Sequence, residues 1–261
     1  MTFKIQGMLI AFENKFLKML KYQQMLTKID TGFNVYSDTP LGKDPDSCSP
    51  TLKSYHRFLW SKPLPHDADF QLIDSLPKVL YHQSNLGEFF LSSDSIGHTY
   101  RNVKSMSHIV SQIPSTELET FFNLCSTIAG YVIFPSKKIN NMMTINGARG
   151  MNRSIKDRFD LTLECIRMYY QTKPNPLSDT LKRYSSFFGL FGSFKGYVDF
   201  FLLQDLVSDN CSSIKFFLPF VSFSHYPLPQ NIDEYRLYKL NLMAFLIKRN
   251  HRIKEFADKT I

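Results

Sequence analysis

The sequence predicts an α+β protein with a central, mostly antiparallel sheet in the first two thirds, packed by a largely helical C-terminal part. Short runs rich in β-branched and aromatic residues, bounded by turn residues, concentrate between residues 70 and 147. Beyond residue 154, apolar residues recur mostly at helical spacing. Strands and helices do not alternate regularly, so α+β fits better than a parallel α/β fold.

The individual elements follow from the same patterns. Ser49 and Pro50 have the residue types of an N-cap and a first helical turn, so a helix is expected to follow over 51–60. Strands are predicted at 70–73, 78–83, 87–93, 131–136, 142–147 and 213–220. Further helices are predicted at 98–113, about 116–129, 155–171, 177–188, 197–207 and 232–257.

The chain length and composition indicate one globular domain at 30–261, preceded by an N-terminal segment. The 261 residues are 43% apolar and 21% charged, which is ordinary for a folded domain. Within 1–29, Leu9, Phe12, Phe16 and Leu20 lie near one helical face and lysines lie mostly elsewhere, so we predict a basic amphipathic helix. This helix either docks on the domain or contacts a membrane surface or a partner, and it is either a true extension or the product of a misplaced start.

The charge distribution permits several kinds of partner without selecting among them. The net charge is +8, and both ends of the chain, 1–29 and 248–254, are basic. No apolar stretch has the length of a secretory signal or of a transmembrane helix, so we expect a cytoplasmic protein. The four cysteines are far apart and have no metal-ligand spacing, and the sequence identifies no cofactor.

Residues 143–170 form the strongest candidate site, because they combine arginines, carboxylates and a glycine pair with an apolar helix face. Helical spacing places the apolar residues on one arc and the carboxylates on the opposite arc. Either the carboxylates orient arginines that bind a phosphate or carboxylate bidentately, or they form a solvated or structural face with ordinary ion pairs. The predicted catalytic carboxylates are Asp157, Asp160 and Glu164, and the predicted ligand-binding arginines are Arg149, Arg153 and Arg158.

Two loops extend this candidate site. The sequence NGARG at 146–150 places glycines around Arg149 just before the predicted helix, where amides and the helix dipole favour anions. A tight strand-to-helix turn is the alternative. The loop 42–47 adds Lys43 as a ligand-binding candidate, and its aspartates favour a turn over a divalent metal site. We therefore predict no metal site.

A second candidate pair lies in RNVKSMSH at 101–108. The spacing of Arg101 and His108 resembles the motif of HEPN ribonucleases, and in a single helix over 98–113 the two side chains would share a face. A histidine and an arginine can move a proton and stabilise a phosphate transition state. HEPN domains are all-helical, however, which disagrees with the predicted strands. The pair is therefore an alternative catalytic site and not the leading one.

Several longer strings resemble a family of bacterial proteins that carries only a domain-of-unknown-function label. They include DTPLGKDPDSCSPTLKSYHRFLWSKPLP, LGEFFLSSDSI, TINGARG, IKDRFDLTLECIRMYYQ, GYVDFFLLQDLV and KRNHRI. The resemblance runs from about residue 30 to residue 253. It implies a bacterial, cytoplasmic protein and supplies no activity.

Two hypotheses about function follow. The leading one is binding of a phosphate-bearing ligand, a nucleotide or a nucleic acid, at the arginine cluster, with catalysis by one carboxylate if the protein is an enzyme. The alternative is a non-catalytic interaction module that contacts a protein partner or nucleic acid through its basic terminal helices. A HEPN-like ribonuclease is a second alternative.

Overall fold

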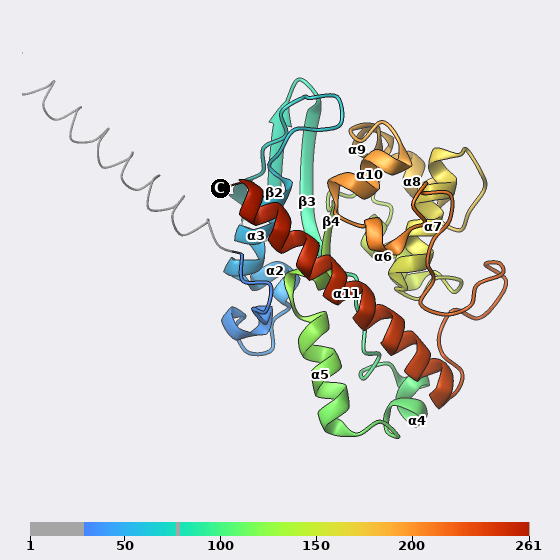
Figure 1. Cartoon of the computed structure of the whole chain (residues 1–261). Coiled ribbons are helices and arrows are strands. Elements are labelled where there is room, and N and C mark those ends of the chain that lie inside the picture. Colours follow the sequence, from blue (N-terminus) through green and yellow to red (C-terminus); the bar gives the residue numbers. More distant parts are fainter. Residues whose placement is uncertain (1–28, 77–78, 261) are drawn as a thin grey trace, which may run out of the picture.

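The computed structural model describes residues 29–76 and 79–260 and has an α+β fold. Figure 1 shows the sheet crossed by the long C-terminal helix, with the other helices gathered around them. The helix predicted for 1–29 lies outside the described residues, except for the buried Ile29. Buried apolar residues from Ile29 to Ala257 belong to one hydrophobic cluster.

The sheet is antiparallel and has the strand order β1-β2-β3-β4. Its strands are β1 (Ile73–Leu76), β2 (Val79–Ser84), β3 (Gly87–Ser95) and β4 (Tyr131–Pro135). The residues of β4 are all buried, as expected for a strand covered on both faces. Four of the six predicted strands are therefore present at or near their predicted positions.

Two predicted strands are wrong. Residues 142–147 pass from a loop into a helix, because the Thr144 side chain caps that helix by accepting the Gly147 N–H at 3.4 Å. Residues 213–220 contribute only an isolated bridge between Ile214 and Val207. An apolar run thus packs into the core here without forming a ladder.

Short helices precede the sheet. They are η1 (Val35–Asp38), α2 (Pro45–Cys48) and α3 (Pro50–Trp60). The predicted cap of α3 is confirmed, since the Ser49 hydroxyl accepts the Leu52 N–H at 3.0 Å. The same hydroxyl donates to the Asp38 carboxylate at 2.6 Å, which fixes η1 against the start of α3.

The segment between β3 and β4 differs from the prediction. Instead of one helix at 98–113 it contains a turn, η2 (Lys104–Met106) and α4 (Ser107–Val110), followed by α5 (Ser115–Cys125) and η3 (Ile128–Gly130). Tyr100 lies in the left-handed region with φ +55°, which a helix cannot accommodate. Arg101 consequently lies in a turn and does not share a helix face with His108 on α4.

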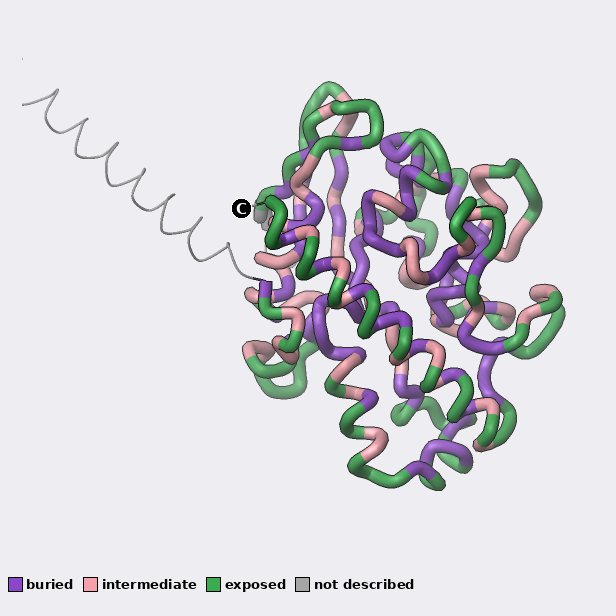
Figure 2. Tube along the Cα trace, viewed as in Figure 1, coloured by how far each residue is buried: buried purple, intermediate pink, exposed green. Residues whose placement is uncertain are grey.

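After β4 the regular elements are helices, and beyond residue 154 this agrees with the prediction. They are α6 (Ile145–Met151), α7 (Phe159–Tyr170), α8 (Ser178–Arg183), α9 (Ser185–Gly189), α10 (Phe194–Phe200), η4 (Gln204–Leu206) and α11 (Ile232–Thr260). Helix α11 crosses the front of the molecule and contacts α4, α5, η3 and η4. Figure 2 shows its turns alternating between buried and exposed residues.

A buried arginine fixes α11 to the layers beneath it. Arg249 is fully buried and donates to the carbonyls of Ala129 at 2.7 Å, Tyr131 at 2.8 Å and Phe201 at 3.0 Å. Burial lowers the pKa of Arg249 to about 9, because no carboxylate among residues 29–76 and 79–260 compensates the lost hydration. In the described part of the chain, no helix is long and apolar enough to cross a membrane.

Candidate functional site

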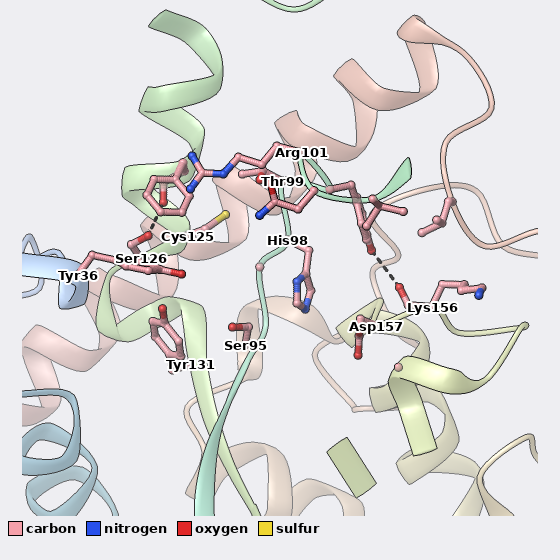
Figure 3. Close-up of a pocket in the computed structure, with 17 residues that line it drawn as sticks. Tyr36, Ser95, His98, Thr99, Arg101, Cys125, Ser126, Tyr131, Lys156 and Asp157 are labelled. Carbon is pink, nitrogen blue, oxygen red and sulfur yellow. Dashed lines mark hydrogen bonds between the residues drawn. The ribbon is translucent and has the colours of Figure 1, made fainter. Parts of the chain in front are cut away.

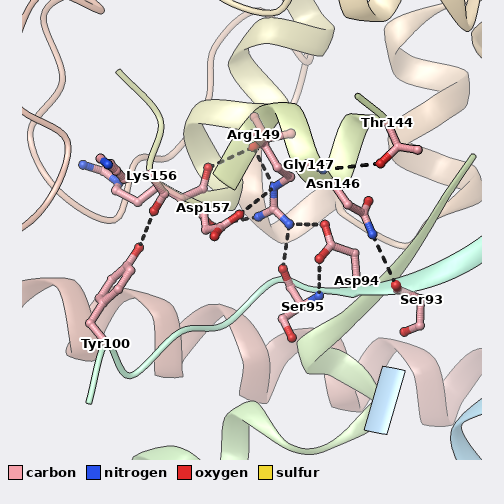
Figure 4. Close-up of polar contacts among 12 residues, drawn as sticks. Ser93, Asp94, Ser95, Tyr100, Thr144, Asn146, Gly147, Arg149, Lys156 and Asp157 are labelled. Carbon is pink, nitrogen blue, oxygen red and sulfur yellow. Dashed lines mark hydrogen bonds and ion pairs between the residues drawn. The ribbon is translucent and has the colours of Figure 1, made fainter. Parts of the chain in front are cut away.

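Arg149 on α6 is a buried structural centre. Its Nη1 donates to the Asp94 carboxylate and, at 2.9 Å, to the Ser95 carbonyl, and its Nη2 donates to the Asp157 carbonyl at 2.8 Å. Its Nε donates to the Thr162 hydroxyl at 3.2 Å. Figure 4 shows how these contacts join the end of β3 to the turn before α7. A ligand would therefore have to displace protein groups to reach this guanidinium.

The charges in this cluster stabilise one another. Burial disfavours the charged form of Arg149, but the nearby Asp94 and Asp157 carboxylates outweigh it and raise the pKa of the guanidinium. Burial raises the pKa of Asp94, with Arg149 opposing that shift. Asp46 of the 42–47 loop is also close, since Asp94 and Arg149 both act on its carboxyl, whose pKa burial raises. The loop thus supplies a carboxyl, and not Lys43, to the cluster.

Two of the predicted carboxylates are engaged in buried ion pairs. Asp160 is fully buried, binds the Arg158 guanidinium through both oxygens and accepts the Phe217 N–H at 2.8 Å. The remaining Arg158 Nη1 donates to the Pro227 carbonyl at 2.7 Å. Glu164 is 7% exposed and forms two 2.7 Å hydrogen bonds with Arg167. The alternative of a solvated face is therefore wrong for these residues, because their charges lie inside the packed helix interface.

The other predicted residues lie apart from this cluster. Lys43 and Arg153 are exposed, and neither side chain forms a hydrogen bond or ion pair with any described residue. The glycines of NGARG lie within α6 and not ahead of it, so they do not form the predicted helix-entry anion site. The Asp157 side chain, 39% exposed, is the most accessible of the three candidate carboxylates.

A cavity of about 360 Å³ lies beside the Arg149 cluster, which is within the range of small-molecule sites. Figure 3 shows it between the end of β3, helix α5 and the turn before α7. Its lining residues are Tyr36, Ser95, Gly97, His98, Thr99, Tyr100, Arg101, Asn102, Val103, Phe122, Cys125, Ser126, Tyr131, Gly150, Lys156, Asp157 and Leu228.

One wall of this cavity combines a cation with aromatic rings. The Arg101 guanidinium carbon lies 3.8 Å from the centroid of the Phe122 ring, and Phe122 lies 5.1 Å from Tyr36. Arg101 is exposed and forms no ion pair with any residue of the described chain. Burial and the Asp44 and Asp46 carboxylates raise the pKa of Tyr36, and Arg101 opposes them. The wall therefore presents a positive group held over the face of a ring.

His98 lies in the middle of the cavity (Figure 3). Its ring stacks on Tyr100 with 5.9 Å between centroids, and its Nε2 has no hydrogen-bond partner among the described residues. Burial and the Arg149 charge lower the pKa of His98 to about 4, against the opposing effects of Asp157 and a hydrogen bond to the Ser95 backbone. The imidazole is therefore neutral near pH 7.

The fully buried His56 differs from His98 because both of its ring nitrogens have hydrogen-bond partners. His56 Nε2 lies 2.9 Å from the Ser93 hydroxyl, which on distance alone matches a nucleophile and its base. The Trp60 indole N–H, however, donates to His56 Nδ1 at 2.9 Å. Nδ1 therefore carries the lone pair and Nε2 carries the proton, so His56 cannot accept a proton from Ser93. This pair is structural.

Three non-glycine residues around the cavity have left-handed backbones. Their φ angles are +55° at Tyr100, +48° at Lys156 and +61° at Asp157. The Tyr100 hydroxyl donates to the Lys156 carbonyl at 3.3 Å, and Figure 3 shows the Lys156 side chain directed away from His98. Strained backbone of this kind is often found at functional sites.

The comparison with protein-family models matches residues 29–253 to one family of unknown function. The chain belongs to DUF6994. This confirms the resemblance to a domain-of-unknown-function family. No curated protein matches this DUF6994 member. No solved structure matches it either.

Sequence reasoning missed His98, Tyr36 and Phe122 as members of a site. Arg101 was a candidate, but with His108, which is exposed on α4. The four-stranded sheet also differs from an all-helical HEPN domain. No cluster of three or more His, Cys, Asp or Glu suited to a metal occurs within residues 29–76 and 79–260.

Proposed function

We propose that the protein binds a small phosphate-bearing ligand, a nucleotide or a short nucleic-acid segment, in the cavity that contains His98 and Arg101. The observation that carries this proposal is the position of Arg101 on the cavity wall, over the Phe122 ring and without a carboxylate partner in the described structure. A guanidinium in this state keeps its planar fork for a phosphate.

The comparison with the other arginines supports this choice. The donors of Arg149 and Arg158 bind protein oxygens inside the fold, so these residues position the cavity wall and do not contact the ligand. Arg153 is exposed outside the cavity lining. Arg101 is the cavity-lining arginine, so the phosphate contact moves from the predicted cluster to this residue.

Aromatic side chains next to Arg101 suit the ring of a base. Tyr36 is 43% exposed and its ring lies 5.1 Å from Phe122, so part of a flat aromatic surface reaches solvent at the cavity. Bases stack on such surfaces with little sequence preference. The cavity therefore combines a stacking surface with a phosphate-binding cation, which is the chemistry of a nucleotide.

Isothermal titration calorimetry with ATP, AMP, a trinucleotide and inorganic phosphate tests the proposal. We expect binding of at least one nucleotide by the wild type and at least about 10-fold weaker binding by Arg101→Ala, since a charge-assisted hydrogen bond contributes about 1.5–3 kcal/mol. Arg153→Ala is the matched control and should bind as the wild type does. Equal binding by the Arg101→Ala variant, or no binding to the wild type, would overturn the proposal.

An observation on α11 favours a second candidate function, a protein-interaction surface. Leu240 is 64% exposed and Ile247 is 56% exposed on a helix whose C-terminal part carries the exposed cations Lys248 and Lys254. Of the four cations in the predicted basic 248–254 end, Arg249 is buried and Arg252 binds the Asp205 carboxylate, so the interaction module would use Lys248 and Lys254. Leu240→Ser with Ile247→Ser should abolish such association, measured as a change in sedimentation with an acidic partner. For both functions we propose that the protein is bacterial and acts in the cytoplasm.

A further inference from the structure

An apolar stripe runs along the outer face of α11. Leu237, Leu240, Ala244 and Ile247 are all exposed and follow one another at intervals of three, four and three residues, the spacing of coiled-coil core positions. Leu237, Leu240 and Ile247 are 39%, 64% and 56% exposed, so the described part of the chain leaves this face open to solvent. Figure 1 shows α11 in front of the sheet and the other helices, where a second molecule can reach it.

The order of large and small residues in this α11 stripe suits a second copy of the same helix. If two α11 helices pack antiparallel with the two-fold axis between Leu240 and Ala244, each Leu240 lies opposite Ala244 of the other copy, and each Leu237 lies opposite Ile247. Large side chains then face small ones at the centre, so the two helices can approach closely. A parallel pair would place Ala244 opposite Ala244 and leave a gap between two layers of bulky residues.

The charges at the two ends of the stripe are also complementary in an antiparallel pair. Asp233 comes one turn before the stripe, its side chain is 89% exposed, and its ion pair with Arg236 is long at 3.9 Å. Lys248, His251 and Lys254 are exposed at the other end. Antiparallel packing brings Asp233 of each copy beside these basic side chains of the other. A parallel pair would instead bring the two basic ends together.

We propose that the protein forms a symmetric homodimer in which the α11 stripes of two copies pack antiparallel. The inference rests on the second candidate function, the interaction surface on α11, and names its partner. Ten residues separate Leu237 from Ile247, which is about 15 Å of helix. Because the contact is small, the dimer is weak, with a dissociation constant on the order of 10–100 μM.

Sedimentation velocity of the full-length protein between about 1 and 300 μM tests the dimer. The sedimentation coefficient of the wild type should rise with concentration. Leu240→Glu should remain monomeric throughout, because the dimer would bury two carboxylates without cations at its centre. Met151→Glu, at a residue that is 71% exposed at the end of α6, is the matched control and should associate as the wild type does. Circular dichroism spectra that match between the three proteins exclude unfolding as the cause.

Cysteine cross-linking tests the antiparallel register. Under mild oxidation, a mixture of the Leu240→Cys and Ala244→Cys proteins should form linked dimers at least about 5-fold faster than either variant alone, because a disulfide needs β-carbons about 3.5–4.5 Å apart. The wild type, whose Cys48 and Cys211 are partly exposed, gives the background rate. Fastest linking by Leu240→Cys alone would mean that the helices do not pack in this register, and would overturn the antiparallel pair.

The outcomes separate this inference from the interaction surface on which it rests. A wild type that stays monomeric at the highest concentration overturns the dimer. If that monomer binds a synthetic helical peptide with leucines at the core positions and glutamates beside them, and Leu240→Ser with Ile247→Ser abolishes the binding, the surface stands with another partner. A monomer that does not bind the peptide overturns both. A dimer that Leu240→Glu does not weaken uses another face and also overturns the inference.

Discussion

The Tyr100 hydroxyl donates to the Lys156 carbonyl at 3.3 Å, so two residues that are 56 positions apart, both with left-handed backbones, hold each other in place. A left-handed backbone is unfavourable for a residue with a β-carbon by about 1–2 kcal/mol. The turn before α7 and the turn after β3 are thus fixed together at the edge of the cavity.

Lys156→Gly should stabilise the protein. Glycine removes the steric cost of φ +48°, and this gain exceeds the extra freedom that glycine gives the unfolded chain, for a net gain of about 0.5–1 kcal/mol. Urea denaturation measures the change. Lys182→Gly, within helix α8, is the matched control and should lose about 1 kcal/mol. Loss of stability at both sites would show that the backbone at Lys156 is not strained.

Arg149→Met should destabilise the protein by about 3–5 kcal/mol, because it leaves the Asp94 carboxylate buried without its cation. The same change at the exposed Arg153 should stay within about 0.5 kcal/mol. Adding Asp94→Asn to Arg149→Met should recover part of the loss by removing the uncompensated charge. Unfolding midpoints in urea for the four proteins check this. A double variant no more stable than Arg149→Met would contradict the ion-pair explanation.

The sequence patterns predicted the fold better than the site. Helix spacing located α7 and α11, and the cap of α3 was readable from Ser49 and Pro50, because these features depend on neighbouring residues. The cavity depends on distant ones, from Tyr36 to Leu228, which no local pattern relates. The sequence placed the charged residues of α7 on one helix face correctly. It did not predict that they are buried, because carboxylates on one helix face have the same spacing whether that face lies in solvent or in the core.

The acid sensitivity of the protein should depend on His98. Its pKa is lowered to about 4 in the fold, below the value of about 6.5 for an unfolded chain. Above pH 6.5 both states are neutral there. As the pH falls from 6.5 toward 4, the unfolded chain takes up a proton that the fold excludes, so the free energy of unfolding decreases by up to about 1.4 kcal/mol per pH unit.

The free energy of unfolding of His98→Gln should therefore fall less steeply between pH 6.5 and 4 than that of the wild type. The difference in slope should correspond to the uptake of about one proton fewer on unfolding. Thermal unfolding monitored by circular dichroism across this range measures it. His56, whose pKa is lowered to about 3 chiefly by burial, and the Asp46 and Asp94 carboxyls are common to both proteins, so their effects cancel in the comparison. Parallel curves would mean that His98 is protonated equally in both states.

Gly130→Ala should prevent proper packing of η3 against α5. A β-carbon at Gly130 would lie 1.9 Å from the Cys125 carbonyl oxygen, and backbone atoms cannot yield as a flexible side chain can. We expect a loss of about 3 kcal/mol or more, or no soluble protein. Gly189→Ala has no atom within 4 Å of its new β-carbon and should change stability by less than about 1 kcal/mol. Wild-type stability of Gly130→Ala would refute this close approach.

The bonds of Arg249 also bear on the order of events during synthesis. The three carbonyls that it binds belong to residues 129, 131 and 201, all of which leave the ribosome before Arg249 does. Until α11 emerges, these groups lack their buried donor and the sheet lacks its front cover. Nascent chains that stop short of α11 should consequently be degraded by added protease, and resistance should arise in a single step once that helix has cleared the exit tunnel.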